Sequence, residues 1–373
     1  MSTVLTNDRY YGEIADAIRA KGVNGAFLPS EMASAIESIP SGGGGDNPLI
    51  IDPSVPPSAD NAGKFCVDAN GKMYRIAQND GNTWYYEPGL LTSNDYQSVC
   101  FGNDRFVCIG YTGSTNKAYY STDGTSWTAM TGLSSDKLWS VTYGGGRFVC
   151  VGNYGSTYFS TNGTSWTAMT MLSYYDYYYS VCYGNGRFVA VGKGGDSCYS
   201  TNGTSWVDMT GLYGNIDYQS VCFGNDRFVC VGKGGDAGYS TNGTSWSHMG
   251  NAGSSMLYGV TYGNGRFVCV GDSGKSYYST NGTSWTAMTG LDSTTFRSVT
   301  YGGGRFVCVG DSGKAYCSTD GMTWTVMNGL TSAANAVTYG NNYLLCVGNK
   351  VTCAKTKPID EYFYNPLKVD SFG

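Results

Sequence analysis

The stretch Ser-Thr-Asn-Gly-Thr-Ser-Trp at residues 200–206 recurs, whole or with small changes, through most of the chain. Its copies end at Trp84, Trp127, Trp166, Trp206, Trp246, Trp285 and Trp324. From Trp127 onward the copies are 39 or 40 residues apart. A second phrase, Arg-Phe-Val-Cys-Val-Gly or a close variant, keeps the same interval and begins at Arg105, Arg147, Arg187, Arg227, Arg266 and Arg305. A period of ~40 residues that holds several strand-like runs predicts the blades of a β-propeller.

One repeat, residues 180–209, divides naturally into four strands. Residues 180–183 form a first strand, and a tight turn of glycine and asparagine joins it to residues 187–191. This second strand is apolar on both faces, as a strand in the interior of a blade requires. Residues 197–200 and 205–209 supply the third and fourth strands on either side of an Asn-Gly turn. Each repeat therefore predicts one four-stranded blade.

Six repeats are complete, and the two ends of the array complement each other. Residues 335–354 supply three strands with no tryptophan phrase after them, and residues 80–86 supply a lone outer strand. We predict an all-β fold, a seven-bladed β-propeller over residues 80–355 whose last blade is closed by this N-terminal strand. Such closure leaves no free sheet edge. An alternative with eight blades would use residues 64–67 and 73–76 as an extra hairpin.

Composition excludes several classes of partner. Charged residues make up 14% of the 373 residues, against ~25% in an average protein. The formal net charge is −5 and no basic cluster opposes it, so we expect no nucleic-acid partner. No segment approaches the ~18 apolar residues of a membrane span, and the first 20 residues lack the apolar core of a signal peptide. We therefore expect no membrane partner and synthesis in a cytoplasm.

The chain has 13 cysteines, but their positions argue against a disulfide framework. One strand position of the repeat holds Cys108, Cys150, Cys230, Cys269, Cys308 and Cys346. Equivalent positions of neighbouring blades lie too far apart to be bridged. We expect free thiols that act as small apolar side chains in a reducing compartment. We expect no metal site, because the chain has no CxxC pair and a single histidine, His248.

The turn residue of the tryptophan phrase alternates between an acid and its amide. The copies read Asp123, Asn162, Asn202, Asn242, Asn281 and Asp320, each followed by a tryptophan at Trp127, Trp166, Trp206, Trp246, Trp285 and Trp324. Over residues ~80–355 this phrase resembles the Asp-box, or BNR, repeat of sialidases and related propellers. Asparagine cannot replace a catalytic acid but makes the same turn, so we predict a structural role.

The resemblance to sialidases does not extend to their hydrolytic residues. A sialidase needs three arginines that converge on a carboxylate, a Tyr–Glu pair and an acidic general acid. Most arginines here occupy the repeated second-strand position, where we expect them to pair with turn carbonyls, and Arg297 is one of two exceptions. Glutamates are rare in the repeats, and no pair of carboxylates suits another glycosidase mechanism. We therefore predict no catalytic residue and no cofactor.

The repeats disagree most at the start of the first strand. There the copies read Gln97, Trp139, Tyr179, Gln219, Tyr258, Arg297 and Asn335. One position earlier they read Tyr96, Leu138, Tyr178, Tyr218, Leu257, Phe296 and Ala334. Strand direction puts these positions on the face opposite the Asp-box turns. The candidate ligand-binding residues are Tyr96, Gln97, Trp139, Tyr177, Tyr178, Tyr179, Tyr218, Gln219, Tyr258, Phe296 and Arg297. The alternative is that some of these aromatic residues only fill the channel.

The N-terminal region carries a second resemblance. Residues 1–40 are predicted to form two short helices with apolar stripes, and the Gly-rich residues 41–45 open a linker and connector that reaches residue 79. The segments 11–22 and 28–39 resemble the helical module that opens many phage and prophage tail-fibre or minor tail proteins. The resemblance implies a part of a virion. Residues 356–373 are expected to form a C-terminal tail.

Together these features favour a non-enzymatic phage tail or receptor-binding protein. Residues 1–40 would bind other tail or baseplate proteins, and the propeller would present its Tyr-rich face to a glycan or protein of the host surface. A second copy of the chain is a further candidate partner. Two alternatives stay open: a structural baseplate or decoration protein that binds other virion proteins, and, third, a sialidase-like glycoside hydrolase.

Overall fold

A computed structural model of the chain describes residues 65–67, 73–78, 82–86, 94–112, 115–133, 137–169, 175–348, 353–356 and 362–366. The chain divides into two compact units. One is Gly81–Lys357, and the other combines Met1–Asp80 with Pro358–Gly373. The helical module predicted for residues 1–40 lies outside the described residues.

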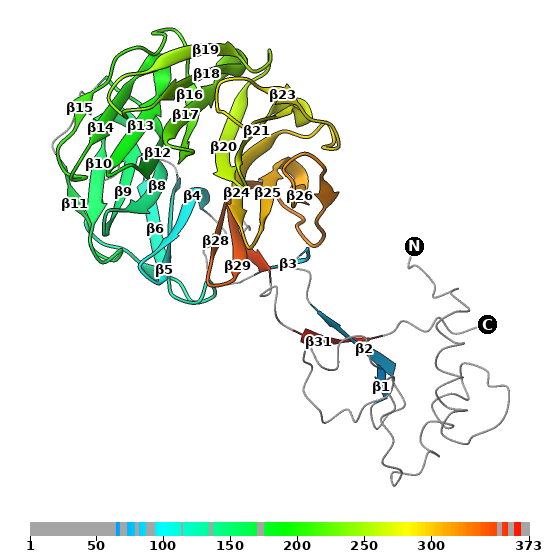
Figure 1. The fold of residues 1–373 in the computed structure, drawn as a ribbon. Helices are drawn as coiled ribbons and strands as arrows, with labels where there is room; N and C mark the ends of the chain where they lie inside the picture. Colours follow the sequence, from blue (N-terminus) through cyan, green and yellow to red (C-terminus); the bar gives the residue numbers. More distant parts are fainter. Residues whose placement is uncertain are drawn as a thin grey trace, which may run out of the picture. The chain divides into compact units, whose positions relative to one another are not determined.

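The larger unit is a ring of seven four-stranded antiparallel sheets, so the predicted seven-bladed propeller is confirmed (Figure 1). The first blade has β4 (Asp95–Gly102), β5 (Arg105–Thr112), β6 (Thr115–Ser121) and β7 (Thr128–Ala129). The second has β8 (Leu138–Gly144), β9 (Arg147–Gly152), β10 (Thr157–Ser160) and β11 (Thr167–Ala168). The third has β12 (Tyr178–Gly184), β13 (Arg187–Gly192), β14 (Ser197–Ser200) and β15 (Val207–Asp208). The fourth has β16 (Tyr218–Gly224), β17 (Arg227–Gly232), β18 (Asp236–Ser240) and β19 (Ser247–Asn251).

The remaining blades repeat this order. The fifth has β20 (Leu257–Gly263), β21 (Arg266–Gly271), β22 (Ser276–Ser279) and β23 (Thr286–Ala287). The sixth has β24 (Phe296–Gly302), β25 (Arg305–Gly310), β26 (Ala315–Ser318) and β27 (Thr325–Val326). The seventh has β28 (Ala334–Gly340), β29 (Tyr343–Gly348), β30 (Cys353–Thr356) and, from the other end of the domain, β3 (Trp84–Tyr86). Single 3-10 turns follow the second strand of five blades: η2 (Asn153–Gly155), η3 (Lys193–Gly195), η4 (Lys233–Gly235), η5 (Asp272–Gly274) and η6 (Asp311–Gly313).

Strand β3 closes the ring as the sequence predicted. Trp84 pairs with Thr356 and Tyr85 with Lys355, so that β3 becomes the fourth strand of the blade begun by β28. The backbone N–H of Trp84 also donates to the carbonyl of Asn328 in the sixth blade, at 2.8 Å. The first strands contact one another around the ring, and β28 contacts β4. The last blade is therefore built from both ends of the domain.

The core lies between the blades, because the second strand of each blade is apolar on both faces. Phe228 and Cys230 of β17 pack with Val189 and Val191 of β13 in one buried cluster, and all four side chains have no exposed surface. Equivalent clusters recur around the ring. Burial of these apolar surfaces is the main stabilising contribution to the fold. Eleven propeller cysteines, from Cys100 to Cys346, are unbridged and lie in or beside the clusters between the blades.

A hydrogen bond crosses five of the seven blade junctions close to the channel. The Oγ of Ser98 accepts from the backbone N–H of Val141 in the next blade, at 3.2 Å. At later junctions the equivalent bond, from a Val N–H of the next blade, is accepted by Ser140, Ser180, Ser220 and Ser298. Gly259 and Ala336 occupy this position in the fifth and seventh blades and bring no hydroxyl group. Two junctions therefore lack an acceptor that the others share.

The Asp-box turns are held by their own side chains. The Oδ1 of Asn202 accepts from the backbone N–H groups of Thr204 and Ser205, both at 2.9 Å. The hydroxyl of Ser200 donates to the same oxygen, at 3.0 Å, and accepts from the N–H of Gly203, at 2.8 Å. The same acceptor role falls to Asp123, Asn162, Asn242, Asn281 and Asp320. Asp and Asn can therefore occupy the same turn position, because either side chain offers this acceptor oxygen.

A second-strand arginine, Arg187, joins its blade to the next one. The Nη1 of Arg187 donates to the backbone carbonyl of Asn242, at 2.6 Å, in the Asp-box turn of the following blade. This is the predicted pairing with a turn carbonyl. The guanidinium also lies 5.7 Å from the centre of the Tyr199 ring in its own blade. In the seventh blade Tyr343 replaces the arginine, and its hydroxyl donates to the carbonyl of Asp123, at 2.6 Å.

The second unit contains a three-stranded antiparallel sheet of β1 (Phe65–Val67), β2 (Met73–Gln78) and β31 (Tyr362–Pro366). Strands β1 and β2 form the hairpin considered above for an eighth blade, with Phe65 opposite Arg75. The eight-blade alternative is wrong, because β2 continues to β31 from the C-terminal tail instead of joining the ring. This pairing between connector and tail was not expected from the sequence.

Candidate functional site

A pocket of about 360 Å³ lies at the end of the central channel where the first strands begin. Its lining takes one residue from each blade: Gln97, Trp139, Tyr179, Gln219, Tyr258, Arg297 and Asn335. These are the seven copies of the single strand position at which the repeats disagree most. Six had been named as candidate binding residues, and Asn335 joins them. The ring symmetry therefore brings together side chains that are about 40 residues apart in the chain.

The residue before each lining residue lies on the other side of the strand. Tyr96, Tyr178, Tyr218 and Phe296 are 0–2% exposed and pack between blades. A β-bulge follows each of them, for example between Tyr218 and Ser220, and it separates the directions of neighbouring side chains. These four are removed from the candidate site, because a fully buried ring offers no surface to a ligand.

Trp139 and Tyr179 form an aromatic wall from neighbouring blades. Their ring centres are 6.1 Å apart in an edge-to-face arrangement. Trp139 makes a second edge-to-face contact with Tyr111, at 5.8 Å. Its indole Nε1 donates to the Oδ1 of Asn153 in the turn η2. The orientation of Trp139 is thus held from two sides.

Tyr258 and Arg297 form a second wall in the fifth and sixth blades, and Asp311, outside the lining, holds the arginine. The guanidinium carbon of Arg297 lies 5.6 Å from the centre of the Tyr258 ring. The Nε and Nη2 of the same arginine donate to the two carboxylate oxygens of Asp311, at 2.7 and 3.1 Å. Such a two-point pair fixes the arginine more firmly than a single bond. The hydrogen bonds to Asp311 raise the pKa of Arg297, so the arginine stays charged and paired.

Carboxylates surround the aromatic residues of the pocket. Burial raises the pKa of the Tyr179 hydroxyl, and the nearby carboxylates of Asp217 and Asp196 raise it further. Burial and Asp272 raise the pKa of Tyr258 in the same way. Arg297 lowers the pKa of Tyr258, but the net pKa shift of both tyrosines is upward, so both are neutral at ordinary pH.

Tyr177, the remaining candidate, is not among the residues that line the pocket. Its ring contacts Tyr154, with ring centres 5.1 Å apart, and the Nζ of Lys193 lies 5.1 Å from its centre. Tyr175 from the same loop is 84% exposed. Tyr174 lies outside the described residues.

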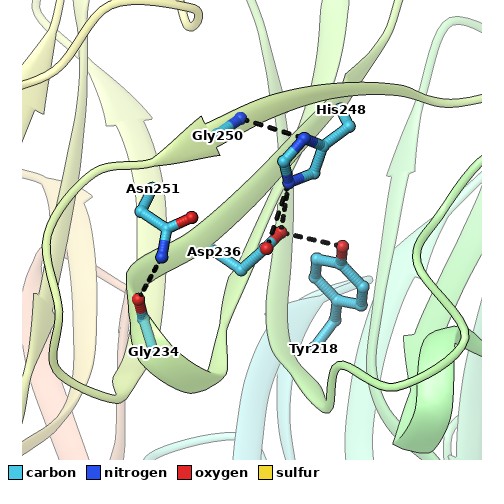
Figure 2. A network of polar contacts seen from close by, with 6 residues as sticks. All are labelled: Tyr218, Gly234, Asp236, His248, Gly250 and Asn251. Carbon is cyan, nitrogen blue, oxygen red and sulfur yellow. Dashed lines mark hydrogen bonds and ion pairs between the residues drawn. The ribbon is translucent and has the colours of Figure 1, made fainter.

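The fourth blade holds a polar network that the sequence analysis missed (Figure 2). The Nε2 of His248 is 3.0 Å from both carboxylate oxygens of the buried Asp236, and the Tyr218 hydroxyl donates to Asp236 Oδ1 at 2.9 Å. The backbone N–H of Gly250 donates to His248 Nδ1, at 3.2 Å, so Nε2 carries the ring proton. Both ring nitrogens are engaged, and the network therefore fastens β19 to the blade instead of supplying a base.

The described part of the chain shows no group of three or more His, Cys, Asp or Glu side chains that could hold a metal ion. Within the same residues, no helix combines the length and apolarity that crossing a membrane requires. The seven residues that line the pocket include no carboxylate, histidine, cysteine or serine. The pocket therefore offers aromatic faces, side-chain amides and one paired guanidinium.

The fold places the chain in the class of seven-bladed β-propellers. No protein-family model and no curated protein matches the sequence. Among solved structures the chain is similar to YCF48 bound to D1 peptide, with 17% identity, a TM-score of 0.59, and coverage of 73% of this chain and 95% of that one. YCF48 from Cyanidioschyzon merolae is also similar, with 14% identity, a TM-score of 0.58, and coverage of 74% and 98%. Virginiamycin B lyase from Staphylococcus aureus is similar with 11% identity, a TM-score of 0.63, and coverage of 76% and 98%. At these identities the likeness shows the fold alone.

Proposed function

We propose that the protein is a non-enzymatic receptor-binding protein of a phage tail, and that the channel pocket is its receptor site. One observation carries the proposal: the strand position that varies most between the repeats supplies one side chain per blade to a single pocket. The position before it holds an apolar or aromatic residue in every copy, and the two positions after it are Ser in five copies and Val in all seven. A surface that varies on a constant scaffold is typical of recognition.

The chemistry of the lining favours binding over catalysis. Hydrolysis of a glycoside or an ester requires a general acid, a base or a nucleophile at the reacting bond. The lining offers two tyrosines, whose pKa values are raised by burial and nearby carboxylates, but no carboxylate, histidine, cysteine or serine to act with them. The carboxylate of Asp311 is bonded to Arg297. The phage assignment is supported by the sequence of residues 1–40, which would attach the protein to the tail.

The proposal is tested by attachment of the full-length protein to a panel of bacterial cells. We expect Trp139→Ala and Gln219→Ala to weaken attachment by about fivefold or more, since an anchoring side chain contributes above ~1 kcal/mol. Tyr175→Ala, on the same face but outside the lining, is the matched control and should attach like the wild type. Melting curves of each variant show whether the fold is kept.

Two outcomes would count against this proposal. If folded Trp139→Ala and Gln219→Ala attach like the wild type, the pocket is not the receptor site. If the wild type attaches to no cell but binds purified tail or baseplate proteins, the structural alternative replaces it. Release of product from a panel of fluorogenic glycosides would overturn the non-enzymatic assignment.

A further inference from the structure

The pocket has two flat walls with amide groups between them. Blades follow one another around the ring, so chain order gives the order of the lining residues. Trp139 and Tyr179 come from the second and third blades, and Tyr258 with Arg297 from the fifth and sixth. Gln219 of the fourth blade separates these walls on one side. Asn335 and Gln97, of the seventh and first blades, separate them on the other.

The charges of the pocket disfavour an anionic ligand. Arg297 is the one cationic side chain in the lining, and its Nε and Nη2 are both bonded to the carboxylate of Asp311. Asp217, Asp196 and Asp272 add negative potential near the two tyrosines. A carboxylate or sulfate group would enter this field without an unpaired cation to meet it. A cationic ligand would meet the guanidinium that already covers the Tyr258 ring.

We propose that the pocket binds an uncharged sugar residue; this rests on the proposed function and names the class of its ligand. A pyranose has an apolar face of C–H groups that suits an aromatic ring, and hydroxyl groups around its edge. The amides of Gln97, Gln219 and Asn335 each carry donor and acceptor atoms for those hydroxyls. A volume of about 360 Å³ is at the low end of the ~300–1,000 Å³ range of small-molecule sites. The pocket therefore suits the end of a glycan.

The first experiment measures binding of the full-length protein to arrayed glycans. We expect the bound glycans to end in an uncharged sugar. Gln219→Leu, which keeps the volume and removes the hydrogen bonds, should weaken binding about tenfold, and Tyr175→Ala should leave it unchanged. Binding to no glycan, binding only to glycans that end in an acidic sugar, or retention of choline in preference to sugars would each overturn the inference.

The second experiment frees the charge of Arg297. In Asp311→Asn the isosteric amide removes the carboxylate that is bonded to the guanidinium. We expect affinity for glycans that end in a carboxylate-bearing sugar to rise at least about fivefold, while affinity for uncharged glycans stays within about twofold of the wild type. Asp292→Asn, which removes the ion pair with Lys314 in the same blade, is the matched control. No gain in binding of acidic glycans by folded Asp311→Asn would show that Asp311 does not set the charge preference.

Failure of the ligand class can be told apart from failure of the function. Periodate destroys sugars on host cells, and a protease removes surface proteins. If attachment needs the pocket residues, survives periodate and is lost after protease treatment, the receptor is a protein. That result supports the receptor-binding function but overturns the sugar ligand. Attachment lost after periodate supports both.

Discussion

Truncation of Trp84 tests the closure of the ring. Trp84 is 2% exposed and packs in the cluster that contains Met327 and Leu330 of the sixth blade. Replacing a buried tryptophan with alanine costs about 3–5 kcal/mol, because the apolar contacts are lost and a cavity remains. At ~2–4 °C per kcal/mol for a domain of this size, Trp84→Ala should lower the Tm by roughly 6–20 °C. Loss of β3 pairing would also expose the edge of β30 and promote aggregation.

Calorimetry and light scattering on two further variants make this test specific. The Trp84 indole nitrogen is buried with no hydrogen-bond partner among the described residues, so Trp84→Phe keeps a packed ring and should cost clearly less. Trp127 occupies the equivalent place in the first blade but is only partly buried, so Trp127→Ala should be milder. A Trp84→Ala protein that melts within 2 °C of the wild type, a difference of ~1 kcal/mol or less, and stays monodisperse would refute the closure argument.

Three further outcomes are expected. Ala336→Ser supplies the missing acceptor for the N–H of Val99 and should add about 0.5–1.5 kcal/mol; a Tm no higher than that of Ala336→Val would refute this. Backbone N–H groups of Thr323 and Met322 lower the pKa of Asp320 in the folded state. The stability that the ionised carboxylate contributes is therefore present above the unfolded-state pKa of ~4, and it is lost as pH falls through the lower folded-state pKa. Between pH ~5 and ~2 the Tm of the wild type should therefore fall more steeply than that of Asp320→Asn, and parallel curves would contradict it. Most of the 13 thiols should react with a thiol reagent after denaturation without reductant; several disulfides found by mass spectrometry would overturn the expectation of a reducing compartment.

The architecture of the propeller was predictable because the same sequence signals recur in each blade. Apolar second strands, Asn-Gly turns and buried tryptophans recur at one interval, so local and global signals agree. The contribution of Trp84 to the last blade followed from counting incomplete repeats. The pairing of β2 with β31 was not predictable, since neither segment repeats and strand pairing across nearly the whole chain leaves no short-range signal.

The strand position that lines the pocket was predictable, but the direction in which the neighbouring side chains point was not. Disagreement between repeats identified Gln97 and its six equivalents, while Tyr96 and its equivalents were included by proximity. Two signals would have separated them. Neighbouring residues of a strand face opposite sides, and the position of Tyr96 is Tyr, Leu, Phe or Ala throughout, which is typical of a core. The partners of the lining, Asp311 and Asn153, come from other loops and carry no signal of their own.

The network around His248 also had a signal in the sequence. The fourth repeat reads Ser-His-Met-Gly-Asn where three others read Thr-Ala-Met-Thr, and β19 spans five residues against two in most outer strands. A single histidine in a chain of otherwise regular repeats marks the place where one blade departs from the rest. Its function there depended on Asp236 and Tyr218, which only the folded blade brings to it.

The seven lining side chains share one strand position, while the contacts that hold the blades together use other positions. Change at the pocket is therefore decoupled from change in the scaffold. A substitution at one copy alters one sector of the wall and leaves the Ser–Val bonds, the second-strand clusters and the Asp-box turns intact. In a propeller of this kind, the chemistry of the pocket can therefore change by single substitutions that leave the contacts between the blades unchanged.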